Sequence, residues 1–185
     1  MVMFLIEQRF QGRDLSEGID LIEPWADELD GLSTTGESVV VVVPERTRAV
    51  AVSLVWGGGI AATEALWDGE LNEGLRCRRC LVPVSGVHLW RGSGAIVRSR
   101  NRSIFLAAGI IVRLSPSALE MCLTLGGRSA ESLTSPLIPL AVSPRFARAW
   151  LSGSATDHLI KLLEGLPWSQ PLSVQCEAAL ARPPI

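Results

Sequence analysis

Residues 81–113 read LVPVSGVHLWRGSGAIVRSRNRSIFLAAGIIVR, and their pattern is the main indication of the fold. Four mainly apolar runs, at 81–84, 87–91, 95–98 and 104–113, are separated by short segments rich in glycine and serine. Runs of this length between turn residues are typical of β-strands. We therefore predict a β framework, with the arginine-rich connection RSRNRS (98–103) on a solvent-exposed turn.

The same stretch lies inside a window that is free of carboxylates. No acidic residue occurs between Glu73 and Glu120, and eight arginines fall in this gap. The 73 residues before the window carry fourteen carboxylates but four arginines, although the net charge of the chain is only −2. Charge sorted in this way usually becomes a one-signed surface, and a positive surface attracts polyanions.

The segments before the window predict strands around one helical region. Residues 1–10 suggest a first strand, although a short buried helix would show a similar pattern, and the five valines at 39–43 indicate a strand buried on both faces. Residues 49–56 alternate with Trp56 on the apolar face, and the glycines at 57–59 are expected to end that strand. Asp14 and the apolar spacing after it predict a helix over about 15–29, broken near Pro24, then a loop at 31–36.

Beyond the window the sequence predicts helices. Segments 115–126, 143–153 and 154–165 each open with a capping residue, two of them as Ser-Pro, and each closes at a glycine. Residues 172–176 read as a last short strand. The expected fold is a single α+β domain over 1–185, with a mixed or antiparallel sheet in the N-terminal two-thirds and helices packed from about residue 115 to 165.

The arginine-rich β segment is the candidate site. Phosphate binding needs fixed positive charges, and base reading needs forked donors on a turn that can enter a groove. The alternative is that these arginines pair with the acidic N-terminal third and only hold the domain together. The predicted base readers are Arg98, Arg100, Asn101 and Arg102, and the predicted phosphate contacts are Arg78, Arg79 and Arg91.

Signals for catalysis or a cofactor are weak. Cys77 and Cys80 form a Cys-x-x-Cys pair, but no other cysteine or histidine stands at zinc-ligand spacing. A nucleophile elbow and a phosphate-binding Gly-rich loop are both missing. We expect no catalytic residue, no metal and no cofactor. Trp56, Trp150 and Trp67 are expected in the core, with Trp90 beside the basic turn as a stacking candidate.

No stretch is long and apolar enough to span a membrane. The N-terminal apolar run lacks the basic residues of a signal peptide and is interrupted at Glu7. We therefore expect a cytoplasmic protein that has no membrane partner.

Several short motifs occur in a suggestive order. They are WGGGIAATEALWDGEL at 56–71, LVPVSGVHLWRGSGAIV at 81–97, SPRFARAWLSG at 143–153, EGLPWSQPLSV at 164–174 and ARPPI at 181–185. In this order they resemble the target-recognition domain of type I restriction-modification specificity subunits, with 1–55 left over as a strand–helix–strand front part. The resemblance implies duplex DNA recognition without catalysis, beside other protein subunits. Full specificity subunits carry two such domains joined by long helices, and no long helix follows Pro184.

Two other functions remain open from the residues. The order strand, helix, strand, strand over 1–56, together with arginine-rich turns, also suits an RNA-binding subunit of a ribonucleoprotein complex of the RNA-guided effector type. The third possibility is a protein-interaction subunit whose basic face docks an acidic partner.

Overall fold

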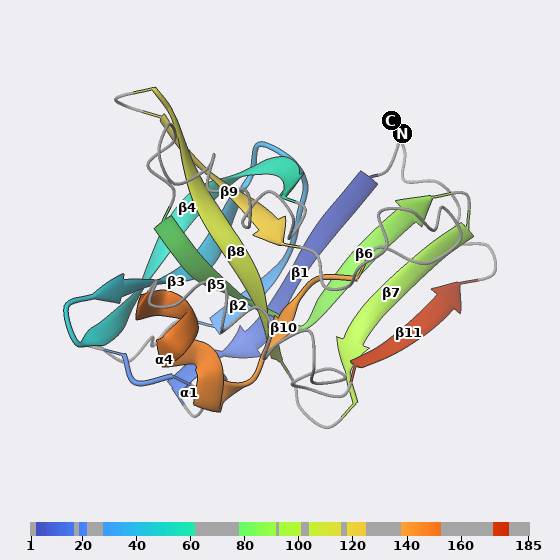
Figure 1. Ribbon diagram of the computed structural model, residues 1–185. Coiled ribbons are helices and arrows are strands. Elements are labelled where there is room, and N and C mark those ends of the chain that lie inside the picture. Colours follow the sequence, from blue (N-terminus) through green and yellow to red (C-terminus); the bar gives the residue numbers. More distant parts are fainter. Residues whose placement is uncertain are drawn as a thin grey trace.

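The computed structural model describes residues 3–16, 19–21, 28–61, 78–91, 93–100, 104–115, 118–124, 138–152 and 172–177. These residues form two β-sheets with two short helices packed beside them (Figure 1). The strands and helices, in chain order, are β1 (Met3–Gln11), α1 (Gly12–Ser16), β2 (Glu28–Ser33), β3 (Ser38–Glu45), β4 (Arg48–Ala61), β5 (Arg78–Val84), β6 (Gly86–Arg91), β7 (Ser93–Ser99), β8 (Phe105–Ser115), β9 (Ala118–Thr124), β10 (Ala141–Val142), α4 (Pro144–Ser152) and β11 (Leu172–Glu177).

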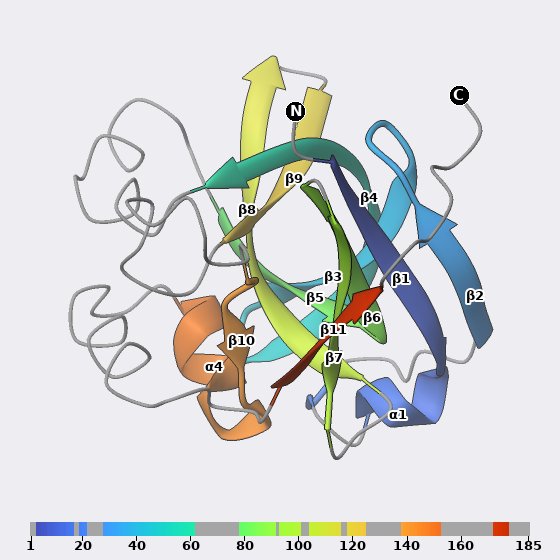
Figure 2. The ribbon, with the colours of Figure 1, turned by 90° about the vertical axis from the view of Figure 1, so that its right-hand side faces the viewer.

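One sheet has five strands in the order β11-β7-β6-β1-β2, and we call it the open sheet. All four of its pairings are antiparallel. Figure 2 shows β11, β7 and β6 facing the viewer, with β1 and β2 beside them. The N-terminal strand β1 is therefore paired on both edges, with β6 on one side and β2 on the other.

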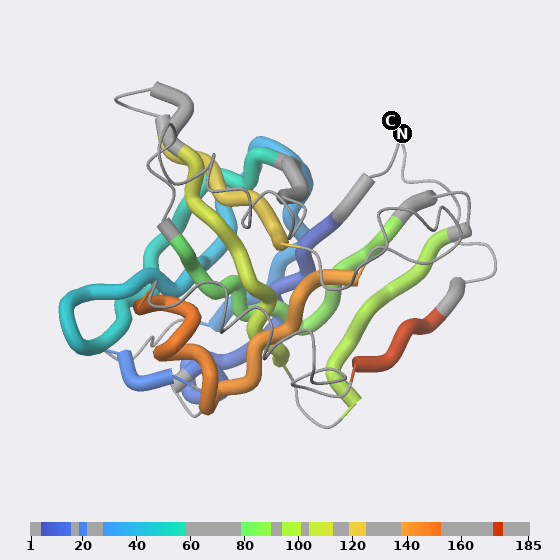
Figure 3. Tube along the Cα trace, in the orientation of Figure 1, coloured from blue at the N-terminus to red at the C-terminus, as the bar shows by residue number. Residues whose placement is uncertain are grey.

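The other sheet has the order β10-β8-β5-β3-β4-β9, and β9 pairs with β8 as well as with β4. The β4–β9 pairing is parallel and the β8–β9 pairing is antiparallel, so five of the strands close on themselves. We call this the closed sheet. The two-residue strand β10 lies along the first part of β8, opposite Leu106 and Ala107. The coloured tube in Figure 3 shows β8 beside β9 and β10.

The valine run confirms the predicted buried strand. Val39 and Val41 belong to a core cluster that fills the closed sheet and continues to the open sheet, where Ile6, Val87 and Val97 join it. We call this cluster the inner core. Val42 faces the opposite side of β3, as the alternation of side chains along a strand requires.

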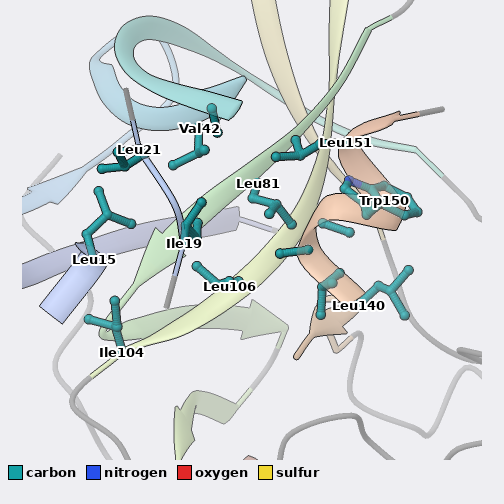
Figure 4. Close-up of a cluster of buried hydrophobic side chains, with 14 of the residues drawn as sticks. Leu15, Ile19, Leu21, Val42, Leu81, Ile104, Leu106, Leu140, Trp150 and Leu151 are labelled. Carbon is teal, nitrogen blue, oxygen red and sulfur yellow. The ribbon is translucent and has the colours of Figure 1, made fainter. Parts of the chain in front are cut away.

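The cluster on that opposite side lies under the two helices, and we call it the outer core. Leu15 and Ile19 reach it from the segment around α1, while Trp150 and Leu151 reach it from α4 (Figure 4). The Trp150 indole N–H donates to the Cys80 carbonyl oxygen at 2.8 Å, which fixes α4 against β5. Trp56 and Trp150 are both fully buried, as their sequence context predicted.

A buried amide joins the two sheets. β3 and β5 are paired at Val42 and Leu81, and two residues further along this register Val40 would lie opposite Pro83. Proline has no N–H to donate to Val40. The Gln8 side chain of β1 takes this place: its Nε2 donates to the Val40 and Pro83 carbonyl oxygens at 2.8 and 2.9 Å, and its Oε1 accepts the Val40 N–H at 2.9 Å.

The predicted α+β class is only partly right, because the described chain is nearly all β. Residues 118–124, which we expected inside a helix over 115–126, form β9. Their apolar residues Leu119, Met121 and Leu123 also alternate with period two, and β8 offers a long partner for a strand in this place. Pairing between strands thus overrides the local capping signal. The expected helix over 154–165 lies outside the described residues.

Two further predictions near the N-terminus are wrong. The expected helix over 15–29 does not form as predicted: the helix present is α1, Leu21 forms a β-bridge with Ala49, and residues 28–33 form β2 against β1, while residues 22–27 lie outside the described part of the chain. The glycines at 57–59 do not end the strand, since β4 runs on to Ala61 with an irregularity between Trp56 and Ile60. Glycine tolerates such a bulge because it has no Cβ.

Other elements are confirmed. The four runs of the basic window form β5 to β8, residues 172–177 form β11, and the Ser143-Pro144 signal begins α4. None of the helices within the described ranges has the length and hydropathy that a membrane crossing requires.

Candidate functional site

A buried carboxylate on the open sheet gathers residues from three strands. Glu7 of β1 binds Arg98 of β7, with 2.7 Å between Arg98 Nη2 and Glu7 Oε2. His88 of β6 approaches the same oxygen, with 2.8 Å from its Nε2. The Glu7 side chain is only 5% exposed, whereas the Arg98 side chain is 35% exposed. We call these three residues the Glu7 cluster.

Gly86 makes the contact between Glu7 and Arg98 possible. It lies opposite Glu7 in the β1–β6 pairing, between the two strands that carry the ion pair. A Cβ atom at Gly86 would lie 2.8 Å from Glu7 Oε2 and 3.5 Å from Arg98 Cζ. The carboxylate and the guanidinium therefore meet over a position where any side chain would displace them.

Opposing effects act on the Glu7 carboxyl group. Burial raises its pKa, since a charge loses its hydration in the protein interior. The hydrogen bond from His88 and the positive charge of Arg98 outweigh this effect, and the pKa of Glu7 is lowered from its ordinary value of 4.5. Glu7 is therefore ionised at neutral pH and accepts hydrogen bonds from both partners.

Further hydrogen bonds and an ion pair hold the residues around Glu7 in place. The Ser85 N–H and hydroxyl donate to the Glu7 carbonyl oxygen at 2.9 and 3.1 Å, and the Ser85 hydroxyl accepts the Arg9 N–H. The Arg9 side chain is more exposed and pairs with Asp30 of β2 at 2.9 Å, with a longer contact of 3.7 Å to Glu7. Backbone and side-chain contacts thus fix Glu7 in one position.

Arg98 is the predicted base reader whose side-chain contacts are resolved. Its strand, β7, is paired with β6 on one edge and with β11 on the other, and Arg98 itself lies opposite Ser173 of β11. The structure records no partner for its side chain other than Glu7 within the described part of the chain. Of the five guanidinium N–H groups of an arginine, this contact occupies one terminal nitrogen.

Arg100, two residues further on, is exposed at the bend that follows β7. Within the described ranges it takes part in no recorded hydrogen bond or ion pair. Asn101 and Arg102 lie outside the described residues. The structure thus brings Arg98 and Arg100 to one end of β7, as the RSRNRS motif predicted, without showing the rest of the turn.

The predicted phosphate contacts are distributed differently. Arg79 is half-buried and lies over Trp150, with 5.0 Å between its Cζ and the indole centroid, and it donates to the Trp150 carbonyl oxygen at 3.3 Å. Burial lowers the pKa of Arg79. Arg78 and Arg91 lie at the first residue of β5 and the last residue of β6, and their side chains are outside the described set. The site role of all three stays a prediction.

The described ion pairs bear on whether the acidic front neutralises the basic window. Arg9 pairs with Glu7 and Asp30, and Arg48 pairs with Asp20, so these contacts stay within the front third of the chain. The contacts that reach into the window are those of His88 and Arg98, and both end on Glu7. Among the described residues, a single carboxylate therefore connects the two halves.

The cysteine motif is only partly described. Cys80 is fully buried in β5, and burial raises the pKa of its thiol far above the usual range. Cys77 lies outside the described residues. No three histidine, cysteine or carboxylate side chains are grouped as metal ligands in the part of the chain that the structure describes.

Sequence reasoning did not identify Glu7 and His88 as site residues. The signal for Glu7 is a single carboxylate inside the apolar run MVMFLIEQRF, on a strand whose neighbours are buried. Buried carboxylates require a cationic partner. No sequence pattern indicates that this partner stands 91 positions later, at Arg98.

No protein-family model matches the chain, and no curated protein matches it. Solved structures do. A phage-related protein from Bordetella bronchiseptica is similar with a TM-score of 0.68 at 16% identity, over 95% of this chain and 94% of its own. A protein from Bacteroides thetaiotaomicron gives 0.67 at 14% identity, over 93% and 90%. A second Bordetella bronchiseptica protein gives 0.62 at 12% identity, over 95% and 99%. Likeness at these identities shows a shared fold over nearly the whole length of each chain.

Proposed function

We propose that this protein is a non-catalytic nucleic-acid-binding module that contacts duplex DNA through the end of β7. The observation that carries the proposal is Arg100, which is exposed at the bend after β7 and is bound by no acidic residue of the described chain. Arg98 lies just before it with part of its guanidinium exposed. Two arginines at the exit of a strand held on both edges provide fixed positive charge for a phosphate backbone.

Strand pairing on both edges of β7 supports the proposed surface. β7 lies between β6 and β11, so the arginines project from an ordered sheet, and Asn101 and Arg102 follow directly in the sequence. The acidic front reaches this region through Glu7, which is buried and engaged by two partners. Its charge is therefore largely compensated where a polyanion would approach.

A salt series tests the proposal. Binding of a labelled duplex DNA would be measured by fluorescence anisotropy from low to physiological salt. For this proposal we assign phosphate contacts to Arg98, Arg100 and Arg102, which the sequence predicted as base readers. Three such contacts predict a slope of log K against log salt of about −3, since each phosphate contact contributes about −0.9. The double variant R100A/R102A should weaken binding and reduce the magnitude of the slope by about 2.

Arg46→Asn is the control for losing a positive charge elsewhere on the surface. Arg46 lies in the turn between β3 and β4, on the left in Figure 1 and away from β7 and β11 on the right. Its φ is 51°, a backbone conformation that asparagine accepts well, so R46N removes one positive charge without added strain. R46N should leave the slope nearly unchanged, and equal affinities of R100A/R102A and the wild type would overturn the proposed surface.

The same series separates the other functions. Tighter binding of single-stranded RNA than of duplex DNA under equal salt would assign the surface to RNA. Binding of an acidic polypeptide but of neither nucleic acid would assign it to a protein partner. A wild-type protein that binds none of these probes would refute the proposed function.

A further inference from the structure

We propose that Glu7 is a positioning residue that holds Arg98 in the orientation needed to receive a phosphate group. This inference rests on the proposed function, since it names how one of the arginines at the end of β7 works. It concerns a contact that crosses from the first strand of the chain into the basic window.

The ion pair between Glu7 and Arg98 has a defined geometry. Glu7 Oε2 accepts Arg98 Nη2 at 2.7 Å, and it is itself held by His88 at 2.8 Å. Arg98 has no other recorded side-chain partner in the described ranges. A planar guanidinium fixed at one terminal nitrogen keeps its other N–H groups in a defined plane. These groups can bind a second anion in the forked manner that suits phosphate.

The two side chains of the ion pair are buried to different extents. The Glu7 side chain is 5% exposed and the Arg98 side chain is 35% exposed, so the carboxylate lies below and the guanidinium extends from it toward solvent. Leu5 and Ile96, next to the cluster on the open sheet, are also almost fully buried and belong to neither core cluster. An incoming phosphate therefore meets the arginine and not the carboxylate.

Removing the charge of Glu7 distinguishes two roles that this residue could have in binding. If Glu7 acted only as a negative charge near a polyanion site, its loss would strengthen binding. If it orients Arg98, its loss leaves that side chain free to rotate. The binding free energy is then reduced by the entropic cost of ordering the Arg98 side chain. Positioning and simple repulsion thus predict changes of opposite sign.

The variant Glu7→Gln tests this difference against Glu45→Gln. Both changes raise the net charge by one, but Glu45 is exposed at the end of β3, beside the Arg46 turn. E7Q should bind duplex DNA about 2- to 10-fold more weakly, the range expected for ordering one flexible side chain, with an unchanged salt slope. E45Q should bind equally well or slightly more tightly. Affinity of E7Q equal to or above that of the wild type, in a folded protein, overturns the proposal while leaving the proposed function standing.

Arg98→Lys provides a second variant that keeps the charge and an ion pair to Glu7. A lysine ammonium is a point donor and does not present a fork to a phosphate. R98K should therefore weaken binding about 2- to 10-fold with the same salt slope, whereas R98A should also reduce the magnitude of the slope by about 1. Wild-type affinity of R98K contradicts the proposal even if E7Q fails to fold.

A measurement without nucleic acid distinguishes the positioning role of Glu7 from the proposed DNA-binding function. The Arg98 Nε–H resonance, assigned by its disappearance in R98K, would be followed by NMR during titration with inorganic phosphate. The wild-type resonance should shift, and the E7Q resonance should need about 2- to 10-fold more phosphate for the same shift. A shift without any DNA or RNA binding would refute the proposed function and support the positioning role. An Arg98 resonance that phosphate leaves unmoved refutes the positioning role.

Discussion

At the scale of single residues, Glu7 links the acidic front of the chain to the basic window. It is a carboxylate on a strand whose neighbours are buried, and its charge is tolerated because His88 and Arg98 bind it. A buried charge of this kind is stabilising only as long as its partners remain, since an unpaired one loses its hydration without compensation. Gly86 is the residue that leaves room for the pair.

The lowered pKa of Glu7 predicts how stability depends on pH. Because the folded-state pKa lies below the ordinary 4.5, the ionised carboxylate contributes stability that is fully present above that value. The contribution is lost as the pH falls through the lower folded-state pKa. We expect E7Q to lower the free energy of unfolding by about 1.5–3 kcal/mol at pH 7, the scale of a hydrogen bond to a charged group.

Urea unfolding at pH 7 and at pH 3 would measure this effect. The difference between the wild type and E7Q should shrink at the lower pH, because protonated Glu7 no longer gains from its ion pairs. A difference that stays constant between the two pH values would contradict the assignment of Glu7 as the ionised partner.

Gly86→Ala gives a prediction about packing at the same place. The new Cβ would lie 2.8 Å from Glu7 Oε2, so the carboxylate must move away from Arg98. We expect G86A to destabilise the protein by about 1–3 kcal/mol, as overpacking usually does. Thermal or urea unfolding would measure it, and the cost should be smaller in the E7Q background than in the wild type. Additive effects would show that the two residues do not share one contact.

At the scale of elements, the junction between β3 and β5 depends on a side chain. Pro83 cannot pair with Val40, and the amide of Gln8 occupies the gap with three hydrogen bonds. A proline in an interior strand is normally excluded because it removes a donor from the ladder. Here β1 supplies the missing donor from another sheet, so β5 tolerates its proline.

Replacing Gln8 by methionine tests this function. Methionine has a similar length but cannot hydrogen bond to Val40, so the N–H and carbonyl groups of that residue lose their partners. Each unsatisfied buried group costs about 1–3 kcal/mol, and we expect Q8M to destabilise the protein by at least 2 kcal/mol. Gln11→Met, on the exposed end of the same strand, should change stability by less than about 0.5 kcal/mol.

Hydrogen exchange adds a local readout to that comparison. The Val40 N–H donates to Gln8 Oε1, and it should exchange faster in Q8M than in Q11M. Equal protection of Val40 in both variants would show that β3 and β5 hold together without the amide.

At the scale of the whole molecule, the two sheets share one core. Ile6, Val87 and Val97 of the open sheet belong to the same cluster as Val41, Trp56 and Phe105 of the closed sheet. Figure 1 shows β1, a strand of the open sheet, running beside the closed sheet. A core that is shared in this way should unfold as a unit, because neither sheet can lose its partner without exposing apolar surface.

Val97→Ala tests this cooperativity. Val97 is fully buried on β7, and removing two methyl groups should cost about 2 kcal/mol. If the sheets unfold together, the amides of Val41 and Ala107 in the closed sheet should lose protection by the same amount as those of β7, measured by hydrogen exchange. Unchanged protection in the closed sheet would mean that the open sheet unfolds separately.

Local pattern predicted much of the fold. The five valines, the alternation before Trp56 and the four runs at 81–113 each became a strand, because apolar β-branched residues between turns leave few other solutions. Ser143-Pro144 began α4 for an equally local reason. Where two readings competed, pairing decided: residues 118–124 lie against β8 and residues 28–33 against β1, partners that no local window contains.

The candidate site divides in the same way. The sequence by itself determined that the arginines of RSRNRS follow a strand, and it determined the charge imbalance between the front and the middle of the chain. Only the tertiary structure decided that Arg98 is bound by Glu7 while Arg79 packs on Trp150. The physical reason is range: strand propensity acts between neighbours in sequence, whereas an ion pair forms between residues that the order β1-β6-β7 places side by side.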